Sequence, residues 1–136
     1  MKAEFRNYLL SVSGLTALVG TRIRWDALPQ GGSLPAIALH MISAPRDYTL
    51  RSRVGLTGFI VQMDVWSATL PAREAIVTAL IAALDGLPGG DSPALIRGAF
   101  IDNQRDTFEL GQGPDATGAA DFYRSSLDVR VWFPEA

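Results

Sequence analysis

Residues 58–67 read GFIVQMDVWS and residues 70–85 read LPAREAIVTALIAALD, and these two neighbouring stretches decide the fold. The first alternates between apolar and polar side chains, and a period of two residues predicts a strand with one buried face. The second repeats apolar residues on one side of a helix, after Pro71, which a first helical turn tolerates. We expect this helix to pack on that strand and on the alternating strand near the end of the chain. The predicted core comprises Phe59, Val61, Met63, Val65, Leu127, Val129 and Val131, packed by Ile76, Leu80 and Leu84.

Further segments extend this unit in both directions. Phe5, Leu9 and Val12 share one helical face and predict an N-terminal helix. Residues rich in glycine, proline and polar side chains separate the periodic segments and indicate loops. The expected segments are a helix at Ala3–Val12, a short helical turn at Leu15–Val19, an extended loop at Thr21–Pro35, a strand at Ala36–Ala44, a loop or protruding hairpin at Pro45–Thr57, strands at Gly58–Ser67, Ala94–Asn103 and Phe122–Phe133, a helix at Leu70–Asp85, a turn at Pro88–Asp91, and a polar loop at Gln104–Ala120.

The element order α-β-β-α-β-β predicts an α+β fold. Four strands would form one mostly antiparallel sheet, with the helices packed on one face. The chain has 136 residues, which is the usual size of a single domain, so we expect one domain over residues 1–136. The fold class alone does not identify a function.

Composition excludes several classes of protein. The chain has no cysteine, so it has neither disulfides nor thiolate metal ligands. Its formal net charge is −2, which gives no general electrostatic case for wrapping nucleic acid. The N-terminus lacks the apolar run of a signal peptide, and no stretch approaches the roughly 20 apolar residues of a membrane span. We therefore expect a soluble protein without a membrane segment.

The sequence also lacks the residue patterns of known catalytic and cofactor sites. His40 is the only histidine, and it stands in an apolar segment without a nucleophile elbow elsewhere in the chain. The acidic residues Asp102, Asp106 and Glu109 do not have the spacing of a calcium loop. The glycine-rich stretch 111–118 lacks the lysine and the following helix of a phosphate loop. We therefore expect no catalytic residue, no metal, no cofactor and no enzymatic activity.

Two groups of polar residues are candidates for contacts with other subunits. Arg46, Asp47, Arg51 and Arg53 stand close together in a segment with little apolar content of its own. A solvated loop and an inter-subunit salt-bridge role are equally good interpretations of these arginines. Gln62 and Asp64 lie on the polar side of the clearest strand and could face a neighbouring subunit. The candidate interface residues are thus Arg46, Asp47, Arg51, Arg53, Gln62 and Asp64.

The chain resembles the tail-completion, or tail-terminator, proteins of tailed phages and phage-derived gene-transfer particles. The first half of the resemblance lies in LVGTRI at residues 18–23, LPQ at 28–30, LPAI at 34–37 and Ile42-Ser43. The second half lies in VQMDVWS at residues 61–67 and in the helix that follows it. Across residues 9–84 the order and spacing of these pieces carry the resemblance.

The resemblance implies a structural part of a virion or phage-like particle, assembled in the bacterial cytoplasm. It implies a homo-oligomeric ring, a hexamer, that caps the tail tube and joins it to the head or its connector. DNA would pass through the lumen without specific binding, and the partners would be the tube protein and a connector or stopper protein. A neighbouring head–tail connector, a minor tail protein, and a small ligand-binding or peptide-binding α+β module remain alternatives.

Overall fold

A computed structural model describes the chain over residues 2–26, 35–44, 46–48, 53–85, 87–88, 96, 98–109 and 122–134. In this part of the chain, three helices and seven strands follow one another. Their bounds are α1 Lys2–Ser11, α2 Ser13–Val19, β1 Ile23–Trp25, β2 Ala36–Ser43, β3 Arg46–Tyr48, β4 Arg53–Ser67, α3 Leu70–Leu84, β5 Leu87–Pro88, β6 Gly98–Glu109 and β7 Phe122–Pro134.

All the described strands belong to one mixed sheet with the order β1-β2-β4-β7-β6-β5, and β3 pairs with β4 outside this path. The long strands β2, β4, β7 and β6 pair antiparallel, whereas β1 pairs parallel to β2. The α+β class and the single sheet are as predicted. The prediction of four strands in the order α-β-β-α-β-β is wrong, because the described sheet has seven strands and one parallel pair.

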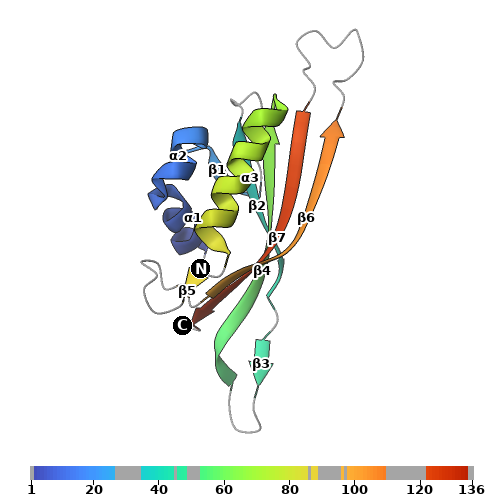
Figure 1. The fold of residues 1–136 in the computed structure, drawn as a ribbon. Helices are drawn as coiled ribbons and strands as arrows, with labels where there is room; N and C mark the ends of the chain where they lie inside the picture. Colours follow the sequence, from blue (N-terminus) through green and yellow to red (C-terminus); the bar gives the residue numbers. More distant parts are fainter. Residues whose placement is uncertain are drawn as a thin grey trace.

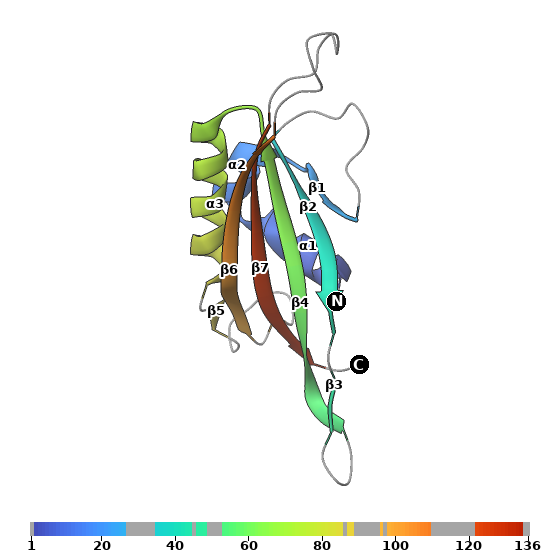
Figure 2. The same ribbon diagram turned by 90° about the vertical axis from the view of Figure 1, so that its right-hand side faces the viewer.

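The helices cover one face of the sheet, and no helix of the described part of the chain lies against the other face (Figures 1 and 2). The predicted core is confirmed: Leu80 of α3 and the inward side chains of β4 and β7 are fully buried in one cluster, against which Phe59 packs. α1 and α2 complete this core with Phe5, Leu9 and Leu15. The opposite face therefore presents Gln62, Asp64 and their neighbours without a covering layer.

The bounds of α3 follow from its terminal residues. Thr69 is extended, and its hydroxyl accepts a hydrogen bond from the N–H of Ala72, which satisfies a donor that has no helical partner. Pro71 stands in the first turn, where its missing N–H costs no hydrogen bond. α2 ends at Gly20, whose φ of 60° lies in a region that glycine adopts without a steric penalty.

Three short or polar segments differ from the expectations. β1 lies inside the expected loop Thr21–Pro35, and the strand β6 continues through Glu109, where a loop was expected from Gln104. Pro88, which was predicted to lie in a turn, belongs to the strand β5. The hairpin interpretation of residues 45–57 is confirmed, because β3 pairs antiparallel with the first residues of β4. The rest of the expected turn, residues 89–91, and residues 110–120 of the expected loop lie outside the described residues.

Candidate functional site

The uncovered face of the sheet carries a polar network centred on Asp64. This carboxylate is only 4% exposed, although no described helix lies over it. It accepts hydrogen bonds from Gln62 Nε2 at 2.9 Å, Ser126 Oγ at 2.6 Å and Arg124 Nη2 at 3.2 Å. His40 Nε2 lies 3.3 Å from the second carboxylate oxygen. Four polar side chains from β2, β4 and β7 therefore converge on one acid, and they bury it.

The structure thus brings Gln62 and Asp64 together, as two residues of the predicted interface. It also shows that Asp64 is engaged within its own chain. Arg124, its ion-pair partner, stacks over the ring of Trp66 at 4.9 Å from the centroid. Asp64 therefore organises this face, and the more exposed Gln62, His40 and Arg124 form its accessible surface.

The arginines of this face that follow along β6 and β7 are each paired with an aspartate. Arg105 on β6 makes two contacts with Asp128 on β7, at 2.7 and 3.3 Å. Arg130 on β7 lies 3.3 Å from Asp102 on β6. A bidentate arginine–carboxylate pair has a fixed geometry and leaves no net charge. The described part of this face is consequently close to electroneutral.

The same face becomes aromatic at the end where β6 begins. Trp132 lies between Gly58 and Gly98 in the register of three neighbouring strands. A Cβ added to Gly58 would lie 2.9 Å from the indole ring, so the glycine allows the ring to lie flat against the strand. Phe100 packs against Gly98 and remains 48% exposed. This end of the face is therefore an apolar surface beside the paired charges.

His40, the only histidine of the chain, lies on the uncovered face and is about one-third exposed. In a hydrolase triad the imidazole lies between the nucleophile and the acid. Here the Asp64 carboxylate itself accepts the hydrogen bond from the Ser126 hydroxyl, and it also contacts His40. This geometry suits a structural network in which the acid is the common acceptor. Within the part of the chain that the structure describes, no group of acids and histidine has the arrangement of a metal site.

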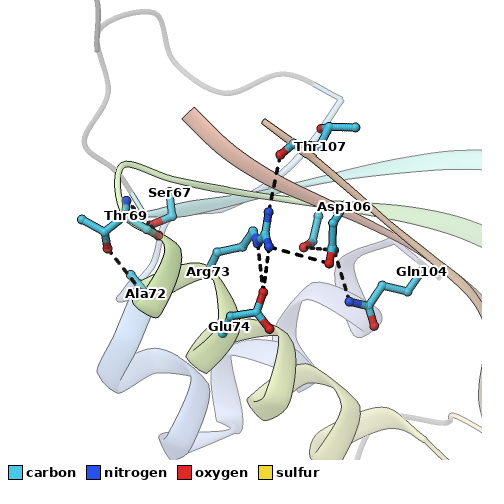
Figure 3. Close-up of polar contacts among 9 residues, drawn as sticks. Ser67, Thr69, Ala72, Arg73, Glu74, Gln104, Asp106 and Thr107 are labelled. Atoms are coloured by element: carbon cyan, nitrogen blue, oxygen red, sulfur yellow. Dashed lines mark hydrogen bonds and ion pairs between the residues drawn. The ribbon is translucent and has the colours of Figure 1, made fainter. Parts of the chain in front are cut away.

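A second network ties the N-terminal end of α3 to β6 and β7 (Figure 3). Arg73 is only 7% exposed and contacts Glu74 at 2.8 Å, Asp106 at 3.7 Å and the carbonyl oxygen of Thr107 at 3.4 Å. The Ser125 hydroxyl donates a hydrogen bond to Asp106. This hydrogen bond is the main reason that the pKa of Asp106 is below its ordinary value.

Arg73 has no role among the residues predicted from the sequence, although its position in the helix indicated one. Arg73 stands at the helical spacing of Ile76, Val77 and Leu80, so it occupies a core-facing position of α3. A buried arginine at such a position requires acceptors from the facing elements. Two of these acceptors, Asp106 and the carbonyl oxygen of Thr107, lie in the part of β6 that was predicted to be a loop.

Two of the predicted arginines, Arg46 and Arg53, lie in a hairpin formed by β3 and the first residues of β4. β3 pairs with β4 at Arg46↔Thr57 and Tyr48↔Arg53, and this hairpin projects beyond the body of the protein (Figure 1). Arg46, Asp47 and Arg53 belong to it, whereas Arg51 lies outside the described residues. Gln62 stands nine positions after Arg53 in the same strand, which corresponds to about 30 Å at the usual rise. The two groups of predicted interface residues therefore lie at different places.

The two edges of the sheet differ in the elements that contact their outer strands. At one edge β1 is short, and Arg6 Nε of α1 donates to the carbonyl oxygen of Ile23 at 2.6 Å. At the other edge β5 pairs with β6 only at Gly98 and Ala99, and Asp85 accepts a 3.5 Å hydrogen bond from the N–H of Ile101. From Asn103 to Glu109, β6 pairs regularly with β7 and has no second strand beside it among the described residues. The side chains of residues 102–108 are exposed.

Comparisons with known proteins agree with the resemblance in the sequence. The family model described as "Tail completion protein gp17" matches residues 4–134. A solved structure described as "Virion of native gene transfer agent (GTA) particle" contains a chain with the same fold. The TM-score is 0.67 at 21% identity, over 99% of this chain and 95% of that chain. The chain matches no curated protein, and no described helix is long and apolar enough to cross a membrane. Because the family model spans nearly the whole sequence, the chain belongs to the tail completion protein gp17 family.

Proposed function

We propose that this protein is a structural part of a phage or phage-like particle, located where the tail meets the head. Copies of the chain form a ring, a hexamer, that caps the tail tube and presents a surface to the connector. The match to the tail completion family over residues 4–134 carries this proposal. The protein acts through contacts with other proteins and carries out no chemical reaction.

The surfaces of the molecule support an assembly role. A ring requires heterologous contacts, in which one patch meets a different patch on the next copy. The chain offers several unlike surfaces: a projecting hairpin, an open strand edge, and an uncovered sheet face with a charged part and an aromatic part. Aromatic residues and arginine are enriched in protein interfaces, and Phe100, Trp132 and Arg130 are neighbours in the register of β6 and β7.

The electrostatics are compatible with a lumen through which DNA passes without specific binding. A protein binds DNA mainly by placing cations on phosphates and releasing counterions. The net charge of this chain is −2, and Arg105, Arg124 and Arg130 on the uncovered face are each engaged by an aspartate. Such a surface offers few free cations to hold phosphates.

Light scattering coupled to size-exclusion chromatography tests the proposal, with the protein alone and with its tube protein. We expect a ring, alone or on the end of tube fragments, that stops further growth of the tube. A chain that stays monomeric at every concentration and never associates with the tube would contradict this function. A monomer of that kind would favour the small ligand-binding module instead.

A further inference from the structure

The exposed side of α3 carries almost no charge. α3 contains only two charged residues, Arg73 and Glu74, and they pair with each other. A helix at a protein surface normally places charged residues on its outer side, whereas a helix that is apolar all round is normally buried. The other exposed side chains of α3, which we call its outer face, are Leu70, Pro71, Ala75, Thr78, Ile81 and Ala82. This composition indicates a face that another molecule covers.

The neighbouring helices show how far this uncharged surface extends. α2 packs beside α3 (Figure 1), and its exposed residues Ser13, Gly14 and Ala17 are uncharged as well. α1, in contrast, carries a lysine, a glutamate and an arginine within its first five residues. Leu70 and Ile81 are 43% and 36% exposed. Exposed apolar side chains that are gathered on one face mark an interaction site more often than scattered ones do.

The uncovered face of the sheet carries a second exposed apolar group. Its members are Ile60, Phe100 and Trp132, which we call the aromatic end. Arg130 pairs with Ile60 on one side and with Phe100 on the other, and Trp132 stands two residues further along β7. Phe100 is 48% exposed, and Arg130 is engaged by Asp102. The aromatic end therefore offers apolar surface beside a charge that is already paired.

The C-terminal half of the outer face of α3 is level with the aromatic end, on the opposite side of the sheet. Asp85, the residue after α3, accepts a 3.5 Å hydrogen bond from the N–H of Ile101, which follows Phe100 in β6. β5 then pairs with the first residues of β6. Ile81 and Ala82, in the last turn of α3, thus lie near the height of Phe100, and the sheet separates them (Figures 1 and 2).

These two surfaces cannot meet within one copy, but they meet between copies that are stacked front to back. In a ring whose axis runs along the strands, rotation leaves each element at its own height, so α3 of one copy arrives at the aromatic end of the next. Pairing of α3 with α3 would close a dimer and leave the aromatic end exposed. Contact between the two unlike surfaces covers both and continues around the ring. A helix on a sheet face is also the packing that the chain uses on its other side.

We propose that the outer face of α3 of one copy packs on the aromatic end of a second copy. This inference rests on the proposed ring and identifies the contact that links its subunits. Neither surface brings an unpaired charge into the contact, so its burial avoids the desolvation penalty of a lone ion. The network around Asp64 lies further along the uncovered face and stays outside the contact.

Insertion of a charge tests each surface separately. Ala82→Arg changes the outer face of α3, and Phe100→Arg changes the aromatic end. Asn7→Arg is the matched control, because Asn7 is exposed on α1. Circular dichroism and thermal unfolding establish that each variant is folded, and light scattering measures assembly. Each of the first two variants should raise the subunit concentration required for the ring by more than about tenfold, since an arginine would be buried in an apolar contact.

The Asn7 control should assemble like the wild-type protein. Wild-type assembly by both Ala82→Arg and Phe100→Arg would overturn the inference and leave the proposed function intact. The inference is also overturned if Ala82→Arg still forms the ring and loses only its association with the tube protein, because α3 then faces the tube. If the wild-type protein never assembles, with or without the tube protein, both the inference and the proposed function fail.

Mixing the two variants distinguishes a contact between unlike surfaces from pairing of α3 with itself. The Phe100→Arg protein keeps an intact α3, and the Ala82→Arg protein keeps an intact aromatic end. At concentrations where each variant alone is monomeric, a 1:1 mixture should give a heterodimer and no larger species. A Phe100→Arg protein that dimerises alone, or a mixture that stays monomeric, would overturn the inference.

Cross-linking provides a measurement that does not depend on a destabilising charge. The chain has no cysteine, so Ala82→Cys combined with Phe100→Cys introduces the only two thiols. With a bifunctional maleimide, the assembled protein should give a ladder of linked chains up to the closed ring on a denaturing gel. The control, Asn7→Cys combined with Phe100→Cys, should give no ladder. A ring without a ladder from the Ala82 pair, or equal ladders from both pairs, would contradict the contact.

Discussion

The hydroxyl of Ser126 on β7 donates a 2.6 Å hydrogen bond to the carboxylate of Asp64 on β4, on the face of the sheet that no described helix covers. Both residues are almost completely buried there. Burial on an uncovered face arises because Gln62, Arg124 and His40 also converge on the same carboxylate. This relationship makes the uncovered face a pre-organised surface, and it can be tested by removing the acceptor.

Asp64→Ala should lower the free energy of unfolding by about 1–3 kcal/mol, because it removes the common acceptor of several partly buried donors. Asp102→Ala is the matched control: Asp102 and Arg130 are both more than 40% exposed, and such a surface pair contributes at most about 1 kcal/mol. Urea unfolding followed by circular dichroism measures both values. Equal losses for the two variants would show that Asp64 does not organise this face.

Leu80→Ala should cost about 2–5 kcal/mol, because Leu80 is fully buried between α3 and the sheet and its truncation leaves a cavity. Thr78→Ala on the exposed side of the same helix should change the stability by less than about 0.5 kcal/mol. The comparison uses the same unfolding experiment. A small effect at Leu80 would remove α3 from the core.

Gly58→Ala should destabilise the protein by about 1–3 kcal/mol, since the new methyl group would enter the ring of Trp132 and force it to move. Gly14→Ala is the control. Gly14 lies in α2 with no atom within 4 Å of an added Cβ, so alanine should stabilise the helix by about 0.4–1 kcal/mol. Thermal unfolding should therefore shift in opposite directions for the two variants, and a shift in the same direction would contradict the close packing of Trp132 on Gly58.

The network around Asp106 should make stability depend on pH. The hydrogen bond from Ser125 lowers the pKa of Asp106, so the folded state favours the charged carboxylate. A lowered pKa contributes stability above the unfolded value, about 3.9, and this contribution is lost as the pH falls through the folded value.

Ser125→Ala should therefore reduce the unfolding temperature more at pH 7 than at an acidic pH below the folded pKa of Asp106, where the carboxylate is protonated in both states. Asn103→Ala, on the exposed part of β6, should show no such difference between the two pH values. A loss at Ser125 that is the same at both pH values would mean that only packing is affected.

The long, regularly patterned elements could be predicted from the sequence, because one of their faces is buried and the pattern records that face. This holds for α3 and for the alternating strands β4 and β7. β1 has three residues and β5 has two, too few for a period to be detected. The second half of β6 is exposed along its length, so its side chains show no alternation, and only pairing with β7 holds it in a strand.

Part of the polar network around Asp64 could be predicted for the same reason. The polar side of β4 is visible as an alternation, which correctly brought Gln62 and Asp64 together. The partners of Asp64 come from β2 and β7, and no local pattern in a single sequence indicates contacts between residues 62 positions apart. The open edge of β6 was missed because its residues were assigned to a loop.

Electron microscopy of particles from a strain that lacks this protein tests the central claim most directly. A ring that caps the tube covers the surface on which the next tube subunit would add. We therefore predict DNA-filled heads beside unjoined tails of irregular or excessive length. Unattached tails of uniform, normal length would contradict the capping role and favour a head–tail connector, and complete, infectious or DNA-transferring particles would contradict both.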